Sequence, residues 1–157
     1  MLMDRIDKTI LHMLAQNANE TATRIGEAVG LSVPAVNKRI RRLQQDGVIR
    51  RFTILTDGKQ VGRPICAFIW LVVQYGAGVE GLISALERDP EVLACYAVTG
   101  EYDYMVQVCT PDVQALEEKI LKLKRYKGVV KSYTMLSLQE HKFQPAVLPD
   151  LKQEDEA

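Results

Sequence analysis

Apolar side chains in the first third of the chain recur every three or four positions, as they do on one face of a helix. This spacing predicts helices over residues 4–17, 22–29 and 33–45. A short turn, residues 30–32, begins with glycine and joins the second predicted helix to the third. Two helices joined by such a turn are typical of a helix-turn-helix.

The segment after the third predicted helix has the features of an extended connection. We expect a strand or wing over residues 48–56, then a turn at Asp57-Gly58 within a linker over residues 57–64. Gly26 lies inside the second predicted helix, where glycine costs about 1 kcal/mol relative to alanine. We interpret Gly26 as a close contact between helices.

The remainder of the chain alternates between strand and helix patterns. Their order, strand-helix-strand-strand-helix-strand, is the βαββαβ order of ferredoxin-like domains. The predicted elements are residues 65–75, 79–88, 92–98, 104–110, 112–126 and 129–138. The expected fold class is therefore α+β, with an N-terminal winged helix-turn-helix over residues 1–56, the linker, a ferredoxin-like domain over residues 65–144 and a loose, acidic tail over residues 145–157.

The first strand of the second domain is apolar on both faces. Phe68, Trp70 and Val72 alternate with an equally apolar set that includes Ile69 and Leu71. Two helices can cover only one face of the sheet, and the tail is short and polar. The other face is therefore expected to meet the same sheet of a second subunit.

Charge divides the chain into two halves, although its formal net charge is zero. Residues 1–63 contain eleven Lys and Arg against six Asp and Glu, and residues 64–157 contain nine against fourteen. The halves therefore carry net charges of +5 and −5. Such asymmetry suggests that the first half binds a polyanion.

The third predicted helix carries most of this positive charge. On a helical wheel Val36, Ile40 and Leu43 face the core, and the polar side chains fall opposite. A run of basic residues alone is more often a solvated surface. Here the run follows a Ser-capped turn and a preceding helix, and this context favours a DNA-binding helix. Arg39 and Arg42 are expected at phosphates, and Asn37, Lys38 and Arg41 at base edges. The full set predicted to lie at double-stranded DNA is Ser32, Pro34, Asn37, Lys38, Arg39, Arg41, Arg42, Arg50 and Arg51.

Catalytic, metal-binding and membrane patterns are lacking in the sequence. His12 and His141 are far apart, no Ser or Cys lies in a nucleophile motif, and no glycine-rich phosphate loop occurs, so no enzyme and no cofactor are expected. The three cysteines lack zinc-site spacing and are expected to act as small apolar residues. The longest apolar run is shorter than the ~20 residues of a membrane span, and the N-terminus lacks a signal core, so we expect a cytoplasmic protein.

Four motifs in order along the chain resemble the leucine-responsive regulator/AsnC (feast/famine) family of transcription regulators. The opening L-M-D-R-I-D-K-T-I-L at residues 2–11 is similar to the family's opening. V-G-L-S at 29–32, with V-x-x-R-I-x-x-L and D-G-V-I after it, is similar to its DNA-binding helix and wing. V-T-G-E-Y-D-Y at 98–104 resembles its effector loop, and K-G-V-V-K-S at 127–132 the turn into its last strand.

The resemblance implies an amino-acid effector and an assembly of dimers, often octamers or similar rings. A turn that contains glycine and aspartate can offer N–H groups to a carboxylate and a carboxylate to an ammonium, although the same residues also suit a plain hairpin. The effector site implied by the resemblance consists of Gly100, Glu101, Tyr102 and Asp103 with Met135, Leu136 and Ser137 near a neighbouring subunit.

Two other functions remain open at the level of sequence. One is an architectural, nucleoid-like protein that wraps DNA with little response to an effector. The other is an enzyme of the same two-part layout, similar to the siroheme decarboxylases, although the exposed Lys38 and Arg41 have no use in such an enzyme.

Overall fold

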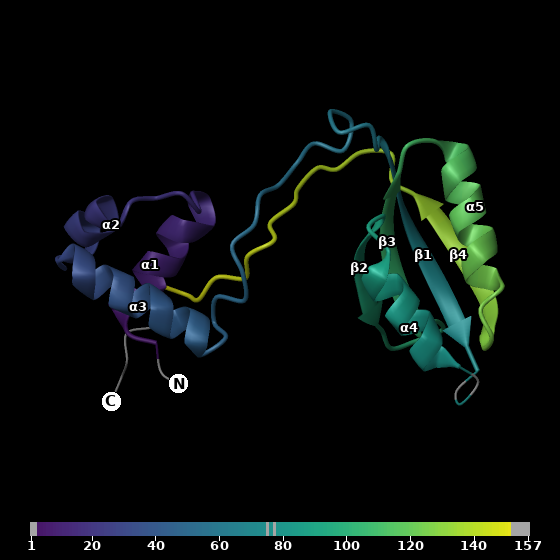
Figure 1. Ribbon diagram of the computed structural model, residues 1–157, viewed down its shortest axis with the longest axis horizontal. Coiled ribbons are helices and arrows are strands. Elements are labelled where there is room, and N and C mark those ends of the chain that lie inside the picture. The colour runs from purple at the N-terminus through teal and green to yellow at the C-terminus, as the bar shows by residue number, and fades with distance from the viewer. Residues whose placement is uncertain (1–2, 75, 77, 152–157) are drawn as a thin grey trace. The chain divides into compact units, whose positions relative to one another are not determined.

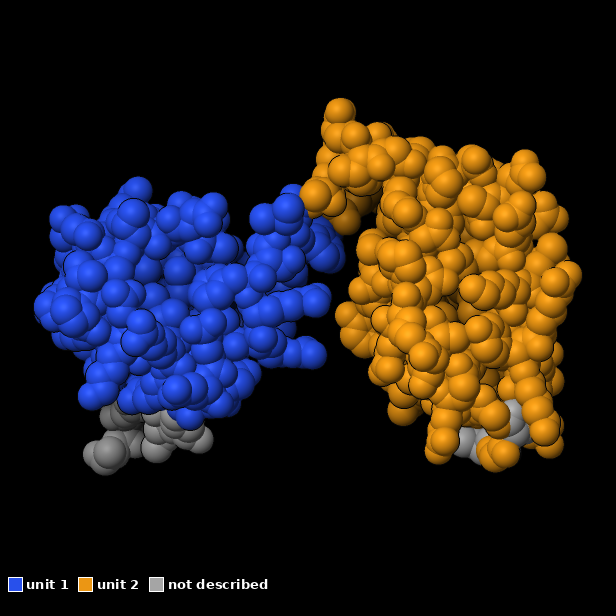
Figure 2. All heavy atoms as spheres, viewed as in Figure 1, with its two compact units in different colours: residues 1–55, 142–157 blue, residues 56–141 orange. Residues whose placement is uncertain are grey.

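The computed structural model describes residues 3–74, 76 and 78–151. The chain forms two compact units, one of residues 1–55 with 142–157 and one of residues 56–141 (Figures 1 and 2). The chain therefore passes between the units twice. The acidic end of the tail, residues 154–156, lies outside the described residues.

The first unit contains the three predicted helices, α1 (Arg5–Gln16), α2 (Ala22–Val29) and α3 (Val33–Gln45). The Asp4 side chain caps α1 by accepting the Asp7 N–H, and Thr21 caps α2 in the same way. Their apolar stripes meet in one core. Its fully or almost fully buried members are Ile10, Leu14, Ile25, Val36 and Leu43.

The turn between α2 and α3 explains two glycines. Gly30 has a φ of 70°, in the left-handed region that glycine adopts easily, and it ends α2. Gly26 has no room for a side chain, because a Cβ there would lie 2.4 Å from the carbonyl oxygen of Leu31. The close contact expected at Gly26 is therefore present, but it is made with the turn after α2, and α3 comes only to ordinary contact distance through Val36 at 3.7 Å.

The strand expected over residues 48–56 is not formed. Ile49 N–H donates to the Leu43 carbonyl at 2.9 Å and closes the end of α3, and residues 50–57 then run without regular structure. Phe52, Ile54 and Leu55 are exposed there. An extended segment forms a strand only where another strand supplies backbone hydrogen bonds, and the described chain pairs none with this one.

The tail differs from its expected loose state, because its described part packs with the first unit. Residues 142–151 belong to that unit, and the Pro149 carbonyl lies 2.8 Å from Nε2 of His12 on α1. Ala146 and Leu148 are partly buried on either side of the exposed Val147.

The second unit is the expected ferredoxin-like domain. Its four-stranded antiparallel sheet has the order β2-β3-β1-β4, with both helices in the connections. The elements are β1 (Ile65–Val73), α4 (Val79–Arg88), β2 (Val92–Ala97), β3 (Tyr104–Thr110), α5 (Val113–Lys124) and β4 (Val129–Leu136). These bounds lie within two residues of the predicted ones, and Tyr75, the expected end of the first strand, lies outside the described residues.

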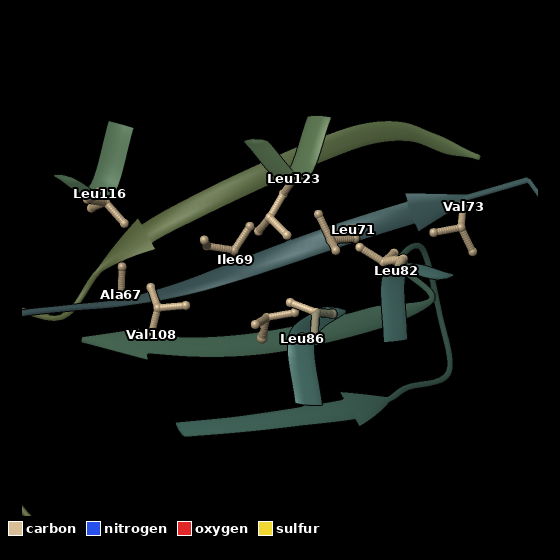
Figure 3. Close-up of a cluster of buried hydrophobic side chains, with 10 residues drawn as sticks. Ala67, Ile69, Leu71, Val73, Leu82, Leu86, Val108, Leu116 and Leu123 are labelled. Atoms are coloured by element: carbon tan, nitrogen blue, oxygen red, sulfur yellow. The ribbon is translucent and has the colours of Figure 1, made fainter. Parts of the chain in front are cut away.

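One face of the sheet forms the core with the two helices (Figure 3). Ala67, Ile69 and Leu71 on β1 are fully buried against Leu82 of α4, Leu123 of α5 and their neighbours. The opposite face of β1 carries Phe68, Trp70 and Val72, which are only partly buried. We call this second face, with its neighbours Tyr96, Met105, Tyr133 and Met135, the open face of the sheet.

The cysteines differ from their expected role. Cys66 and Cys109 are directly opposite each other on β1 and β3, and they form a disulfide with a Cα–Cα distance of 4.3 Å. Their expected behaviour as small apolar residues is therefore wrong. Only Cys95, on β2, is a free thiol, and it packs against the helix-covered core.

The contact at Gly26 can be tested by substitution with alanine. Gly26→Ala is expected to destabilise the protein by about 1–3 kcal/mol, because the Leu31 backbone must move and this cost outweighs the gain in helix propensity. Gly81→Ala is the matched control, since Gly81 also lies in a helix and a Cβ there meets nothing within 4 Å. Urea unfolding of both variants measures the difference, and equal stabilities would contradict the close contact.

Candidate DNA-binding helix and effector loop

Helix α3 has the orientation that its sequence pattern predicts. Val36 and Leu43 are fully buried, whereas Asn37, Lys38 and Arg41 are exposed along the opposite side. Ser32 and Pro34 are also exposed at the start of the helix, where Ser32 occupies the cap position without a capping hydrogen bond from its side chain. The first turn and the outer face of α3 are therefore free to enter a groove of DNA.

Two arginines on the flank of α3 bind α1. Both carboxylate oxygens of Asp7, a fully buried residue, accept hydrogen bonds, one from Arg39 Nη1 at 2.9 Å and the other from Arg42 Nη2. Arg39 also donates to Asp4 at 2.6 Å. These arginines were predicted to lie at phosphates, and the structure gives both an intramolecular partner instead. Contact of these two arginines with DNA stays a prediction. Arg42 is the more accessible of the two, because its side chain is 48% exposed and that of Arg39 is 25% exposed.

The electrostatics of this cluster favour its charged form. Hydrogen bonds to Asp4 and then Asp7 raise the pKa of Arg39. Burial acts to raise the pKa of Asp4, but hydrogen bonds from the Asp7 N–H and from Arg39 outweigh it and hold that pKa below its usual value. Asp4 and Arg39 therefore form an ion pair at neutral pH, and this pair ties α3 to the start of α1.

Sequence reasoning missed the role of Asp7, although a signal was present. Asp7 lies three residues before Ile10 and seven before Leu14, so it falls on the apolar stripe of α1. A carboxylate at such a position enters the core and needs a cationic partner. Arg50 and Arg51, by contrast, are exposed in the segment after α3, as a role at phosphates requires.

The predicted effector loop is the turn between β2 and β3. Gly100 has a φ of 114°, which favours glycine, and Gly100 and Glu101 are exposed. Asp103 is bound to β1, because its N–H donates to the Leu71 carbonyl at 2.9 Å and its Oδ2 accepts the Val73 N–H at 2.8 Å. Asp103 therefore fixes the loop to the sheet with one carboxylate oxygen, and its role at an ammonium stays a prediction.

The second part of the predicted effector site lies at the other end of the strand. Met135 and Leu136 pair with Phe68 and Ala67, near the start of β1, and both are exposed. The Gly100–Asp103 loop meets β1 at Leu71, about 13 Å further along the strand. Within one chain the backbones of the two parts therefore lie apart along β1, and the Tyr102 side chain extends toward the second part through its contact with Tyr133.

Aromatic side chains connect the effector loop to the open face. The Tyr102 ring lies 5.7 Å from that of Trp70 and 6.3 Å from that of Tyr133, and Lys131 Nζ lies 5.8 Å from the Tyr102 centroid. Trp70 Nε1 is buried and has no hydrogen-bond partner among the described residues. Buried N–H groups are nearly always paired, so we expect the Trp70 N–H to bind an acceptor outside the described residues.

A shallow cleft of about 410 Å3 in the second unit is lined mainly by charged side chains. Lys119 Nζ lies 2.5 Å from Asp89 and 2.7 Å from Glu91, and Arg63 lies 2.9 Å from Glu91. Burial disfavours the charged Lys119, yet its hydrogen bonds to both carboxylates raise its pKa. These charges are paired with one another, so the cluster holds the end of the linker against the sheet and is not an evident ligand site.

The described residues contain no group of three or more His, Cys, Asp or Glu side chains placed to hold a metal ion. No helix among them has the length and apolarity needed to cross a membrane.

The fold and the exposed α3 define the class of protein, a helix-turn-helix DNA-binding regulator with a ligand-binding domain. Residues 3–50 match the winged helix-turn-helix DNA-binding family, and residues 66–147 match the Lrp/AsnC ligand binding domain. The chain belongs to the Lrp/AsnC family of transcription regulators.

Several relatives and solved structures are similar over nearly the full chain. The HTH-type transcriptional regulator FL11 of Pyrococcus horikoshii is 32% identical over 89% of this chain and 92% of its own. LrpC of Bacillus subtilis is 28% identical over 83% and 90%, and its solved structure has a TM-score of 0.81. The regulator NMB0573 of Neisseria meningitidis, solved as a complex with L-Met, has a TM-score of 0.86 at 28% identity over 93% of this chain and 96% of that one.

The Asp7 cluster can be tested by a change that removes charge but little volume. Asp7→Asn is expected to destabilise the protein by about 2–4 kcal/mol, because Arg39 and Arg42 lose the buried carboxylate that they share. Asp46→Asn, at the exposed end of α3, is the control and is expected to change stability by less than about 0.5 kcal/mol. Thermal unfolding followed by circular dichroism measures both, and an Asp7→Asn protein as stable as the control would contradict the assigned role.

Proposed function

We propose that this regulator binds double-stranded DNA as a dimer, with an α3 helix of each subunit in the major groove of one half-site, and that an α-amino acid changes its assembly and so its DNA affinity. The observation that carries the DNA part is the orientation of α3. Its buried apolar side fixes Asn37, Lys38 and Arg41 outward, and these are side chains that bind base edges bidentately or as cations.

The open face of the sheet supports the dimer. Its exposed members include Tyr96, Tyr133 and Met135, and beside them Trp70 Nε1 is buried with no acceptor in the part of the chain that the structure describes. The same sheet of a second copy is the simplest cover, because a two-fold interface places identical apolar faces together. Burial at ~25 cal/mol per Å2 of apolar surface favours such an association before its entropic cost is subtracted. Rings of such dimers, up to octamers, are the further assembly that we propose.

The divided effector site also supports assembly. The backbones of the Gly100–Asp103 loop and of residues 135–137 lie apart along β1, so we infer that a neighbouring subunit completes the site of a small ligand that touches both sets. A ligand that binds only at a subunit junction shifts the assembly by mass action, and the assembly determines how many α3 helices reach DNA together. The L-Met complex of the similar NMB0573 supports an amino acid as the effector. We place this regulator in the cytoplasm, where the chromosome of a prokaryotic cell lies.

Selection of bound duplexes from a random DNA pool, with and without a mixture of amino acids, tests the proposal. The expected result is a palindromic consensus whose half-site centres are one helical turn, or a multiple, apart. An architectural protein would return no consensus and a long footprint, and a protein that retains no duplex in dilute buffer would remove the proposal.

Arg41 is the side chain expected to contribute most to sequence specificity. Arg41→Ala is expected to weaken binding to the selected duplex by about 1–3 kcal/mol and to relax the preference at one base pair. Arg125→Ala, at the exposed end of α5, removes the same charge from the other unit and is expected to leave the affinity for DNA unchanged. Fluorescence anisotropy with labelled duplexes measures both variants. Equal losses would show that only net charge matters.

The effector is expected to bind only where subunits meet. Calorimetric titration with each of the twenty amino acids is expected to give heat for a small subset, together with a change in sedimentation. Gly100→Val is expected to reduce that heat, because a β-branched side chain is strained at a φ of 114° and blocks the backbone of the loop. Titrations without heat and without a change in size would contradict an amino-acid effector.

A further inference from the structure

The disulfide between Cys66 and Cys109 has no part in the proposed DNA-binding and effector functions. The two residues are a directly opposed cross-strand pair on β1 and β3. Side chains alternate along a strand, so the pair is on the same side of the sheet as Phe68 and Trp70, but it lies at the start of β1 beside the linker and is not among the residues of the open face. Cys66 is partly exposed and Cys109 is almost fully buried.

The pair lies where both connections between the units join the sheet. The linker leads into β1 directly before Cys66, and Arg63 in that linker donates to the Cys109 carbonyl at 3.4 Å. The C-terminal segment leaves from the end of β4, where the Ser137 N–H donates to the Cys66 carbonyl at 2.8 Å. The Cys109 N–H donates to the Glu91 carbonyl at 3.0 Å. The linker continues into β1, and the C-terminal segment is hydrogen-bonded to β1 at Cys66. The disulfide therefore joins β3 to the strand at which both connections are attached.

We propose that Cys66 and Cys109 form a reversible dithiol–disulfide site that exchanges with low-molecular-weight thiols and disulfides and sets how firmly the two connections are held. This proposal rests on the proposed function in two respects, the cytoplasmic location of the protein and its binding to DNA as a dimer. A regulator meets its DNA where soluble thiols keep cysteines reduced, and the disulfides that form there in most organisms are redox-sensing or catalytic.

A small-molecule disulfide is the oxidant, and it accepts the two electrons that the two cysteines lose when their disulfide forms. The thiolate of Cys66, the more exposed of the two, attacks one sulfur of that disulfide, whose sulfur–sulfur bond breaks and releases one thiolate. The Cys109 thiolate then attacks Cys66 Sγ and expels the second thiolate. The protein loses two electrons and two protons, and the oxidant is reduced to two thiols. Two small thiols reverse both steps.

The third cysteine is no competitor for this exchange. Cys95 pairs with Val106 on the opposite face of the sheet and packs against the helix-covered core. Burial, and then the charge of Glu87, raise the pKa of the Cys95 thiol, which leaves less of the reactive thiolate. Oxidation is therefore expected to join Cys66 and Cys109 and to leave Cys95 as a thiol.

The disulfide has a mechanical effect on the start of β1. With the bond, the end of β1 that receives the linker cannot separate from β3. Without it, this end opens by local fluctuation, as strand ends do. In the proposed dimer, firmer linkers narrow the range of distances between the two α3 helices. The oxidised form therefore binds two correctly spaced half-sites more tightly, and a single half-site equally well.

A redox titration of the full chain tests the site. The Cys95→Ala protein is equilibrated with mixtures of reduced and oxidised glutathione, and free thiols are trapped and counted by mass spectrometry. We expect complete conversion between dithiol and disulfide within these mixtures while the protein stays folded. A bond that glutathione cannot open, a bond that never forms, or a stable mixed disulfide with glutathione would each overturn the proposal.

Amide hydrogen exchange then tests the mechanical effect. Reduction is expected to speed exchange by about tenfold or more at the amides of the two pairs that flank the disulfide on β1 and β3, Ile65–Thr110 and Ala67–Val108, and to leave the amides of α1 unchanged. The Cys66→Ser/Cys109→Ser protein is expected to match the reduced form. Exchange that is independent of the redox state would overturn the proposal, and wild-type protein alone gives this result if the double variant does not fold.

The DNA affinities of the oxidised and reduced forms test the regulatory role of the disulfide. The oxidised form is expected to bind the selected two-site duplex at least about threefold more tightly than the reduced form, with equal affinity for a duplex that carries one half-site. Equal affinities for the two-site duplex would overturn the regulatory role. If neither form binds DNA, the proposed function fails, and thiol counting and hydrogen exchange still decide whether the site exists.

Discussion

The buried carboxylate of Asp7 determines how the DNA-binding helix is held. A carboxylate removed from water is costly unless cations and hydrogen bonds surround it, and here Arg39 and Arg42 supply both. The two arginines come from one flank of α3, so satisfying Asp7 fixes the rotation of that helix about its axis. Apolar packing of Val36 and Leu43 alone tolerates small rotations, whereas two charge-assisted hydrogen bonds do not. The outward direction of Arg41 therefore follows from the apolar packing of α3 together with the contact that its flank makes with Asp7.

A second constraint acts on the sheet, whose central strand β1 is apolar on both faces. The helices satisfy one face within the chain, and the fold leaves Phe68 and Trp70 on the other only partly buried. Two further features of the second unit lie on this open face. The Trp70 N–H has no acceptor in the described chain, and the aromatic contacts of Tyr102 connect the effector loop to the same surface. The proposed assembly and the proposed effector site therefore share one patch of side chains.

Local patterns in the sequence were enough to predict most of the fold. Helical spacing located α1, α2 and α3, and the β3 and α4 bounds matched to the residue. The winged helix-turn-helix class was confirmed, but the strand over residues 48–56 was predicted wrongly, because a strand depends on a partner that local sequence does not reveal. The disulfide was missed for a related reason. The positions 66 and 109 become neighbours only through the register of β1 with β3, which periodicity does not specify. At the site, the outer face of α3 was predictable from a helical wheel, whereas the pairing of Arg39 and Arg42 with Asp7 depended on how two helices pack.

The discontinuous first unit has a consequence for how the protein is made. Residues 142–151 are synthesised after the whole of the second unit, yet they pack with helices that are synthesised before it. On the ribosome, domains fold as they emerge, and the second unit emerges whole before this segment does. The DNA-binding unit therefore receives its final packing segment only after the ligand-binding unit is complete, so a truncated product lacks part of the former even when it contains every residue of the three helices.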